Sequence, residues 1–116
     1  MDKDQNFNGI LIVNKDTGFT SRDVVNKVSK ILKTRKVGHT GTLDPLAKGV
    51  LVLTIGKYTK LSNYFTSKYK TYIAEFDIGY ETDTLDSTGL VVYKDDKVCD
   101  ISKLEICIKS FVGTYL

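Results

Sequence analysis

GHTGTLDPLAKGVLVLTI, residues 38–55, decides how the rest of the chain is interpreted. Residues 38–49 hold three glycines, the only proline and the only histidine of the chain, so they cannot be regular structure throughout. The continuous apolar run of residues 50–55 is typical of a buried strand. The stretch therefore predicts a long ordered loop that leads directly into the core, with His39 and Asp44 displayed on the loop.

Two elements are predicted before this loop. Residues 9–13 (GILIV) form a short apolar run after an Asn-Gly pair, which favours a buried strand that ends near Asn14. From Thr20 onward, apolar residues recur at helical spacing with lysines between them. This pattern predicts a helix with one buried stripe and one basic face. Thr20 and Asp23 are three residues apart and fit a capping box at its start.

Five further elements are predicted after the buried strand. Residues 70–79 (KTYIAEFDIG) alternate between two faces, which is typical of a strand. Residues 101–111 carry apolar side chains at helical spacing behind Asp100, a candidate N-cap. The remaining expectations are a short helix at 57–65, an acidic turn at 80–89 and a returning hairpin strand at 90–93.

The length and charge of the chain limit its class. Its 116 residues allow one domain, and its 41% hydrophobic and 27% charged residues match a soluble globular domain. The net charge of +3 conceals an asymmetry, because residues 1–70 hold 13 Lys and Arg against 5 Asp and Glu, whereas residues 71–116 hold 4 against 9. The basic part favours an anionic partner, most commonly a nucleic acid, and a plain solvated surface is the alternative.

Several classes are excluded by what the sequence lacks. Cys99 and Cys107 match no zinc or redox spacing, so we expect free thiols in a reducing compartment. No apolar run is long enough to span a bilayer, and the charged N-terminus lacks the apolar centre of a secretory signal. We therefore expect a cytoplasmic protein without membrane contact. No metal-ligand cluster, dinucleotide motif or P-loop is present, so neither a metal nor a cofactor is predicted.

Asp44 allows two interpretations at this point. An aspartate fixed between glycines and followed by Pro45, with His39 nearby in the sequence, suits a nucleophile, an acid or base, or a metal ligand. The alternative is structural, because Asp followed by Pro is also a favoured way to begin a turn. Spacing alone does not decide between them.

The longer string GHTGTLDPLAKGVLVLTIGKYTKL closely resembles the catalytic motif of the TruB family of tRNA pseudouridine synthases. Three other segments resemble further family motifs in the same order, and together they cover residues 9 to about 113. They are GILIVNKDTGFTS (9–21), KTYIAEF (70–76) and GYETDTLDSTG (79–89). The resemblance implies an α+β fold with a mixed, mainly antiparallel sheet flanked by helices.

The resemblance also assigns roles to residues. Asp44 corresponds to the catalytic aspartate, Tyr72 to the active-site tyrosine and His39 to a histidine that contacts the RNA substrate. Lys15, Gly41 and Asp86 match motif positions expected at the substrate site. One departure is visible, because Asp16 follows Lys15 where the family commonly has proline, which leaves the role of that lysine open. Without the resemblance, Tyr72 would be read as a core residue and His39 as a loop residue satisfied by the backbone.

The function implied is isomerisation of uridine 55 in the T loop of tRNA to pseudouridine, without a cofactor. Lys33, Arg35 and Lys36 are candidates for contacts with the RNA backbone. Two alternatives are a non-catalytic RNA-binding module and a guide-dependent enzyme that acts on another RNA. Because residues 1–116 stop before the family's later motifs, we expect the N-terminal part of a catalytic domain. We expect this part to be inactive alone and able to self-associate, within a full-length enzyme that is a monomer.

Overall fold

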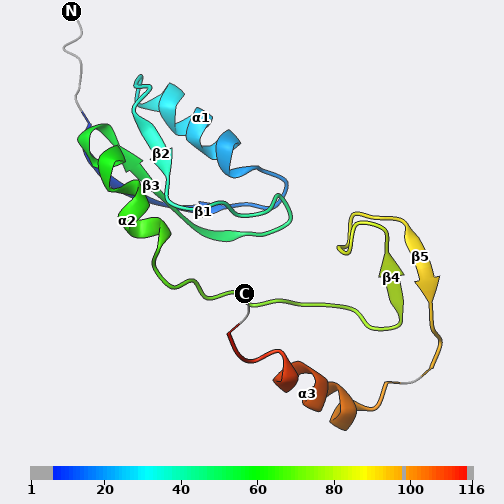
Figure 1. The fold of residues 1–116 in the computed structure, drawn as a ribbon. Coiled ribbons are helices and arrows are strands. Elements are labelled where there is room, and N and C mark those ends of the chain that lie inside the picture. The colour runs from blue at the N-terminus through cyan, green and yellow to red at the C-terminus, as the bar shows by residue number, and fades with distance from the viewer. Residues whose placement is uncertain (1–6, 98, 115–116) are drawn as a thin grey trace, which may run out of the picture. The chain divides into compact units, whose positions relative to one another are not determined.

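The computed structural model describes residues 7–97 and 99–114, and its secondary structure is drawn in Figure 1. The chain divides into two compact units, Met1–Thr71 and Tyr72–Leu116. This division falls one residue from the point where the sequence changes from basic to acidic. The charge asymmetry of the sequence is therefore a difference between two structural units.

The first unit contains a three-stranded sheet with the order β1-β3-β2. Its strands are β1 (Gly9–Lys15), β2 (Val37–His39) and β3 (Gly49–Ile55), and both neighbouring pairs are antiparallel. The buried strand predicted at residues 50–55 is confirmed as β3. The short strand β2 was not expected, because its three residues include a glycine and are too few to show a periodic pattern.

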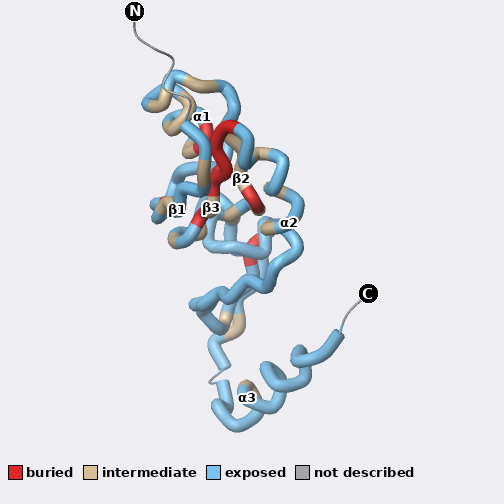
Figure 2. The backbone as a smooth tube through the Cα atoms, turned by 90° about the vertical axis from the view of Figure 1, so that its left-hand side faces the viewer, coloured by how far each residue is buried: buried red, intermediate tan, exposed pale blue. Residues whose placement is uncertain are grey.

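Helix α1 (Ser21–Ile31) begins at the predicted capping box. The Asp23 N–H donates to the Thr20 hydroxyl oxygen at 3.0 Å, and the Thr20 N–H donates to the Asp23 carboxylate at 2.9 Å. The helix places Val25 against Leu51 and Leu53 of β3, and these three residues form the buried centre of the unit, drawn in red in Figure 2. Partly buried side chains surround them: Val13, Val24, Val28, Val37 and Leu43.

Strand β1 exists as predicted, but the expectation that it is buried is wrong. Its register pairs Val13 with Leu51 on the face that α1 covers, whereas Ile12 pairs with Val52 on the opposite face. Because side chains alternate along a strand, only half of the apolar run can reach the helix. Ile12 consequently stays 69% exposed.

The predicted helix at 57–65 is confirmed as two short pieces. It begins as a 3₁₀ helix, η1 (Gly56–Leu61), and continues as α2 (Ser62–Thr66). The hydroxyl groups of Ser62 and the fully buried Thr54 lie 2.7 Å apart and hydrogen-bond. A Cβ on Gly38 would lie 3.3 Å from both hydroxyl oxygens, so a glycine there leaves room for this link between sheet and helix.

The second unit contains a hairpin and a helix. Strands β4 (Tyr80–Thr82) and β5 (Val91–Lys94) are antiparallel, and α3 (Ile101–Ser110) follows. The Asp100 carboxylate accepts the Ser102 N–H at 2.9 Å, which confirms the predicted N-cap. The α+β prediction, with antiparallel sheets, is therefore correct. None of the helices in the described part of the chain is long and apolar enough to cross a membrane.

The strand predicted at 70–79 is wrong. These residues lie outside regular secondary structure, and side chains from both of the predicted faces, such as Tyr72 and Ile73, are exposed. A strand needs a neighbour for its backbone hydrogen bonds, and no strand among the described residues pairs with this segment. The predicted returning strand instead pairs with residues 80–82.

Candidate active site

The loop of residues 38–49, called the Asp44 loop below, starts at the end of β2. His39 is paired with Leu53 in the sheet, and the following residue, Thr40, is buried. The Thr40 N–H and hydroxyl both donate to the Val52 carbonyl oxygen, at 3.0 and 3.1 Å. The loop therefore leaves the sheet at Thr40, which two hydrogen bonds hold to β3.

Ser21, the first residue of α1, fixes the Asp44 loop immediately before the aspartate. The Leu43 N–H donates to the Ser21 hydroxyl oxygen at 2.9 Å, and that hydroxyl donates to the Leu43 carbonyl oxygen at 3.3 Å. Ser21 is 3% exposed. Its side chain thus binds both backbone groups of the residue that precedes Asp44.

Lys15 and Gly18 fix the loop immediately after the aspartate. The Gly18 N–H donates to the Pro45 carbonyl oxygen at 2.7 Å, and the Lys15 ammonium lies 3.5 Å from the same oxygen. The ammonium also donates to the carbonyl oxygens of Phe19 at 2.7 Å and Asp16 at 3.0 Å. Lys15 is only 1% exposed. The structure thus gives it a definite task, which is to join the β1–α1 connection to the Asp44 loop.

Asp16 occupies the position where the family commonly has proline. Hydrogen bonds restrain the backbone here in place of a proline ring. Its carboxylate accepts the Thr17 N–H at 2.9 Å, and the Thr17 hydroxyl donates to the Leu46 carbonyl oxygen at 3.3 Å. The connection is therefore restrained by hydrogen bonds where a proline would restrain the dihedral angle φ.

Asp44 itself begins a turn, as the structural interpretation predicted. Its carbonyl oxygen accepts the Ala47 N–H at 3.0 Å, with Pro45 at the second position of the turn. The residue is exposed, and none of the described residues donates a hydrogen bond to its carboxylate or forms an ion pair with it. The backbone of Asp44 therefore builds the turn, while its carboxylate remains available to a ligand.

His39 and Gly41 lie on the same loop. The His39 Nδ1 is buried and has no hydrogen-bond partner among the residues that the structure describes. Leaving a buried polar atom unpaired is costly, so this nitrogen is suited to a group supplied from outside. A Cβ on Gly41 would lie 3.0 Å from Cε of Lys70, so the glycine permits a close approach of that side chain.

Tyr72 and Asp86 belong to the second unit. Tyr72 is exposed and lies outside regular structure. One oxygen of the Asp86 carboxylate accepts hydrogen bonds from the Thr88 hydroxyl at 2.5 Å, the Thr88 N–H at 2.8 Å and the Thr84 hydroxyl at 2.8 Å. These bonds, the Thr88 side chain first, hold the pKa of Asp86 below its usual value. Asp86 therefore organises the β4–β5 turn.

Lys33, Arg35 and Lys36 are exposed, but they lie far from Asp44 and from the part of the loop that is fixed to Ser21. The loop is fixed to the first residue of α1, whereas these three residues follow the last residue of the helix. Eleven helical residues separate the two ends, which corresponds to roughly 16 Å at about 1.5 Å per residue. The three residues are close to Asp44 in the sequence and distant from it in space.

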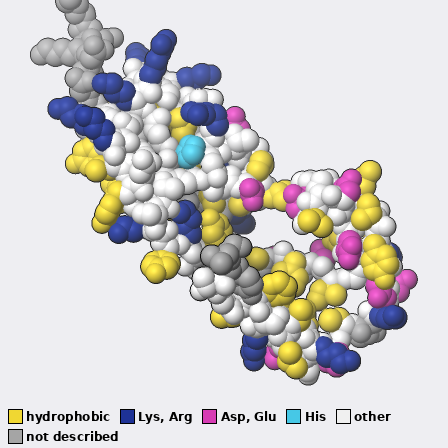
Figure 3. All heavy atoms as spheres, viewed as in Figure 1, with side chains coloured by type: hydrophobic (Ala, Val, Ile, Leu, Met, Phe, Trp, Pro, Cys, Tyr) yellow, Lys and Arg dark blue, Asp and Glu magenta, His cyan; other side chains and the backbone are white. Residues whose placement is uncertain are grey.

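A further signal in the sequence distinguishes Asp44 from the other acidic residues. Between Asp23 and Glu75, Asp44 is the only acidic residue among ten Lys and Arg. Figure 3 shows this basic character as dark blue side chains spread over the first unit. A single carboxylate on a surface that otherwise attracts anions favours a specific functional role for that carboxylate over a general contribution to solubility.

Metal ligation is not supported by the described residues, in which no three His, Cys, Asp or Glu side chains gather into a possible metal site. Cys99 and Cys107 are free thiols, as expected, and both are exposed.

Comparison with known protein families finds a match that includes the Asp44 loop. A model described as TruB family pseudouridylate synthase (N terminal domain) matches residues 29–116. The chain belongs to the TruB family. The match includes the whole Asp44 loop, both predicted sites in the second unit and the basic residues that follow α1.

Relatives within the TruB family are bacterial proteins named tRNA pseudouridine synthase B. The chain is 49% identical over 106 residues to that of Borreliella burgdorferi (strain ZS7), covering 91% of the chain and 38% of the relative. It is 50% identical over 107 residues to that of Fusobacterium nucleatum subsp. nucleatum, covering 90% and 37%. It is 53% identical over 106 residues to that of Caldicellulosiruptor saccharolyticus, covering 91% and 37%. The chain thus spans less than two fifths of the length of these relatives.

Proposed function

We propose that this chain carries the catalytic aspartate of a tRNA pseudouridine synthase that converts uridine 55 in the T loop to pseudouridine. The observation that supports the proposal is the state of Asp44. Its neighbours Leu43 and Pro45 are both fixed by hydrogen bonds, while its own carboxylate is exposed and unpaired among the described residues. A restrained backbone with a free nucleophilic group is the arrangement that covalent or electrostatic catalysis requires.

The proposed reaction is an isomerisation that needs no external group or electrons. The N1–C1′ glycosidic bond of uridine breaks, the uracil rotates, and a C5–C1′ bond forms. The hydrogen on C5 leaves as a proton, and N1 gains a proton. Asp44 starts this sequence by attack on the sugar or the base, or by assisting loss of the base through a glycal.

The other site residues receive supporting roles in the proposal. A uridine in a folded loop must be unstacked at a cost of a few kcal/mol, and contacts in the pocket must offset that cost. Tyr72 stacks on the extruded uracil. His39, whose Nδ1 is unpaired among the described residues, occupies the space in the RNA that the flipped base leaves. Gly41 allows close approach of the backbone, and Lys15 holds the loop. Asp86 contributes by fixing the turn that follows Tyr72 in the sequence.

The implied partner is tRNA, so we place the protein in the cytoplasm, where it acts as a monomer. The test uses the intact protein and a T-arm RNA hairpin that carries uridine tritiated at C5. Tritium is released to water only when C5 loses its hydrogen, so the release reports formation of the new carbon–carbon bond. We expect release that approaches one equivalent per target uridine.

A matched RNA control makes the assignment specific. In a second hairpin, cytidine replaces the target uridine while the other tritiated uridines stay in place. We expect no release from it. Equal release from both hairpins would refute uridine 55 as the target, and no release from either by the intact protein would refute the enzymatic function and favour a binding module.

A further inference from the structure

Four exposed basic residues gather at the end of the first unit that is remote from Asp44. Three follow α1 and the fourth is the second residue of η1. They are Lys33, Arg35, Lys36 and Lys57, together called the distal basic surface. We propose that this surface binds RNA phosphates several nucleotides away from the target uridine. The inference rests on the proposed function, since it assumes that the ligand of the Asp44 loop is RNA.

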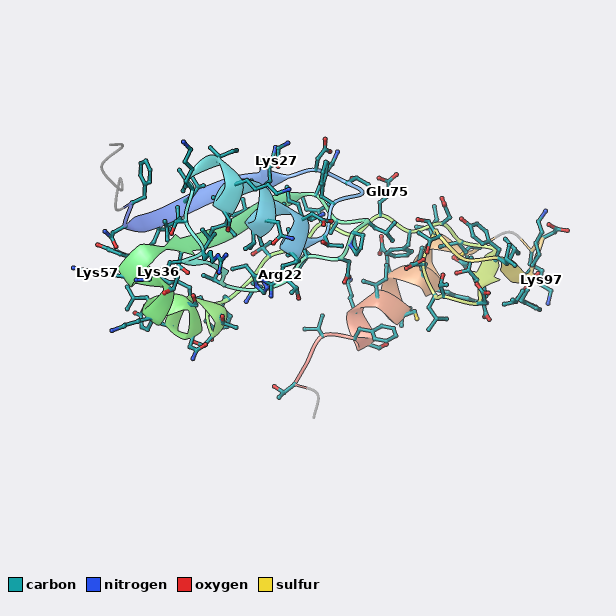
Figure 4. The ribbon with its side chains drawn as sticks, turned by 90° about the horizontal axis from the view of Figure 1, so that it is seen from above. Arg22, Lys27, Lys36, Lys57, Glu75 and Lys97 are labelled. Carbon is teal, nitrogen blue, oxygen red and sulfur yellow. The ribbon has the colours of Figure 1, made fainter. Side chains whose placement is uncertain are left out.

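Hydrogen bonds join the two segments that form the distal basic surface. The Gly56 N–H donates to the Lys36 carbonyl oxygen at 2.8 Å, and Figure 4 shows Lys36 and Lys57 at the same end of the unit. The Lys57 N–H donates to the Asn8 side-chain oxygen at 2.8 Å. The Lys36 N–H donates to the Thr34 hydroxyl oxygen at 3.2 Å. The backbones that carry these two lysines are therefore held in place before any ligand binds, which lowers the entropy cost of binding.

Lys33 occupies a backbone position that favours glycine. Its φ is +49°, and the bonds from the Thr34 N–H to the Ser29 carbonyl oxygen and from the Lys33 N–H to the Lys30 carbonyl oxygen form a Schellman motif. Glycine is the usual residue at this position because a Cβ is strained there. Lys33 therefore occupies this position at the expense of local stability, and a role of its side chain in binding gives a reason for the strain.

The positive charge of this surface is not neutralised within the described residues. The one ion pair among the described residues joins Lys94 and Asp96, which belong to the second unit. Asp23 and Asp44 are the acidic residues nearest in the sequence. Asp23 lies in the first turn of α1, and Asp44 follows Leu43, which is hydrogen-bonded to Ser21 at that same end of the helix. The described part of the distal basic surface therefore carries a concentration of positive charge that attracts an anionic ligand.

The position of the surface indicates which part of an RNA it meets. Strand β3 runs from Gly49, which pairs with Lys15 beside the Asp44 loop, to Ile55, which precedes the distal surface. The six residue-to-residue steps of this strand, at about 3.4 Å each, give roughly 20 Å between its two ends. Phosphates recur about every 3.4 Å along one strand of a duplex, so this distance spans several nucleotides. A regular polyanion fits both sites at once, which favours RNA over an acidic protein segment.

The salt dependence of RNA binding tests the proposal. In the intact protein, all four residues of the surface are changed to alanine, and a matched variant changes four exposed lysines of the second unit: Lys94, Lys97, Lys103 and Lys109. Binding to a T-arm hairpin is measured by fluorescence anisotropy over a range of salt concentrations. We expect the slope of log Kd against log salt to fall by about one for each phosphate that the variant no longer binds, hence by up to about four. The matched variant keeps the wild-type slope.

A pair of single variants separates charge from folding. Lys33→Ala and Lys33→Gly remove the same charge, but only glycine relieves the backbone strain. We expect an equal reduction in slope from both, although the glycine variant melts at the higher temperature. A wild-type slope in the four-residue variant would overturn the proposal. The proposal would also be overturned if the four-residue variant no longer bound an acidic polypeptide but still bound RNA as the wild type does.

Tritium release, measured in parallel, keeps the two proposals distinct. If the protein releases tritium but the four substitutions leave the salt slope of RNA binding unchanged, only the proposal for the distal basic surface is contradicted. A protein whose slope depends on them but which forms no pseudouridine contradicts only the enzymatic function.

Discussion

The hydroxyl of Ser21 and the backbone of Leu43 exchange two hydrogen bonds, at 2.9 and 3.3 Å. They connect the first residue of a capped helix to the residue before Asp44. Because the same helix supplies Val25 to the core, the loop's geometry is tied to the packing of the first unit. The position of the candidate catalytic carboxylate thus depends on a serine that the sequence did not single out.

Ser21→Ala removes both bonds and leaves two backbone groups of Leu43 without this partner. We expect the free energy of unfolding to fall by about 1–3 kcal/mol, measured by urea denaturation. Tritium release should slow by up to about 100-fold because the loop loses its fixed position. Ser29→Ala on the same helix is the control, and equal effects of the two substitutions would contradict the anchoring role.

Lys15→Met keeps a long side chain in the buried position and removes the ammonium. The carbonyl oxygens of Phe19, Asp16 and Pro45 then lose a charged donor, so we expect a loss of about 1–2 kcal/mol in stability. The rate at saturating RNA should fall while the KM changes little. Lys30→Met removes an exposed charge from α1 and should change neither quantity. Unaltered turnover in Lys15→Met would show that the clamp does not position the loop.

The capping box makes stability depend on pH in a defined direction. Hydrogen bonds from the Thr20 hydroxyl and backbone lower the pKa of Asp23 below its ordinary value of 3.8. A depressed pKa in the folded state stabilises the fold above the unfolded-state pKa, and this stabilisation is lost as pH falls through the folded-state pKa. We therefore expect Asp23→Asn to lower the melting temperature at pH 7 and to have little effect below the folded-state pKa. A difference that grows on acidification would contradict this account.

Lys33→Gly should stabilise the protein. Its φ of +49° is accessible to glycine without a Cβ penalty, so we expect a gain of up to about 1 kcal/mol in the free energy of unfolding. Chemical denaturation of the variant and of Lys30→Gly provides the comparison. Glycine at position 30 lies within the helix and should cost about 1 kcal/mol. Destabilisation by both substitutions would show that Lys33 is not strained.

The sequence predicted the elements whose signals are local. The apolar run of β3, the capping box of α1 and the Asp100 cap of α3 each depend on residues a few positions apart, and each is present. The loop between β2 and β3 was also predicted, since its glycines and proline exclude regular structure throughout.

The failures concern non-local information. Alternation at 70–79 predicted a strand, but pairing depends on a neighbour that the pattern does not supply. The burial of β1 depends on which face α1 covers. Hydropathy does not predict a buried Lys15, because its three carbonyl acceptors come together only when the β1–α1 connection and the Asp44 loop are folded against each other. Likewise, the length of α1 separates Lys36 from Asp44, although the two are close in the sequence.

The central claim is that the exposed carboxylate of Asp44 performs the chemistry. The most direct measurement is the single-turnover rate of tritium release, at saturating intact protein, for wild type, Asp44→Asn and Asp16→Asn. Asp16 is a matched control, because it is also an exposed aspartate on a neighbouring connection and asparagine can still accept the Thr17 N–H. We predict that Asp44→Asn binds the T-arm hairpin but abolishes release, while Asp16→Asn retains it. Release by Asp44→Asn at the wild-type rate would contradict the account.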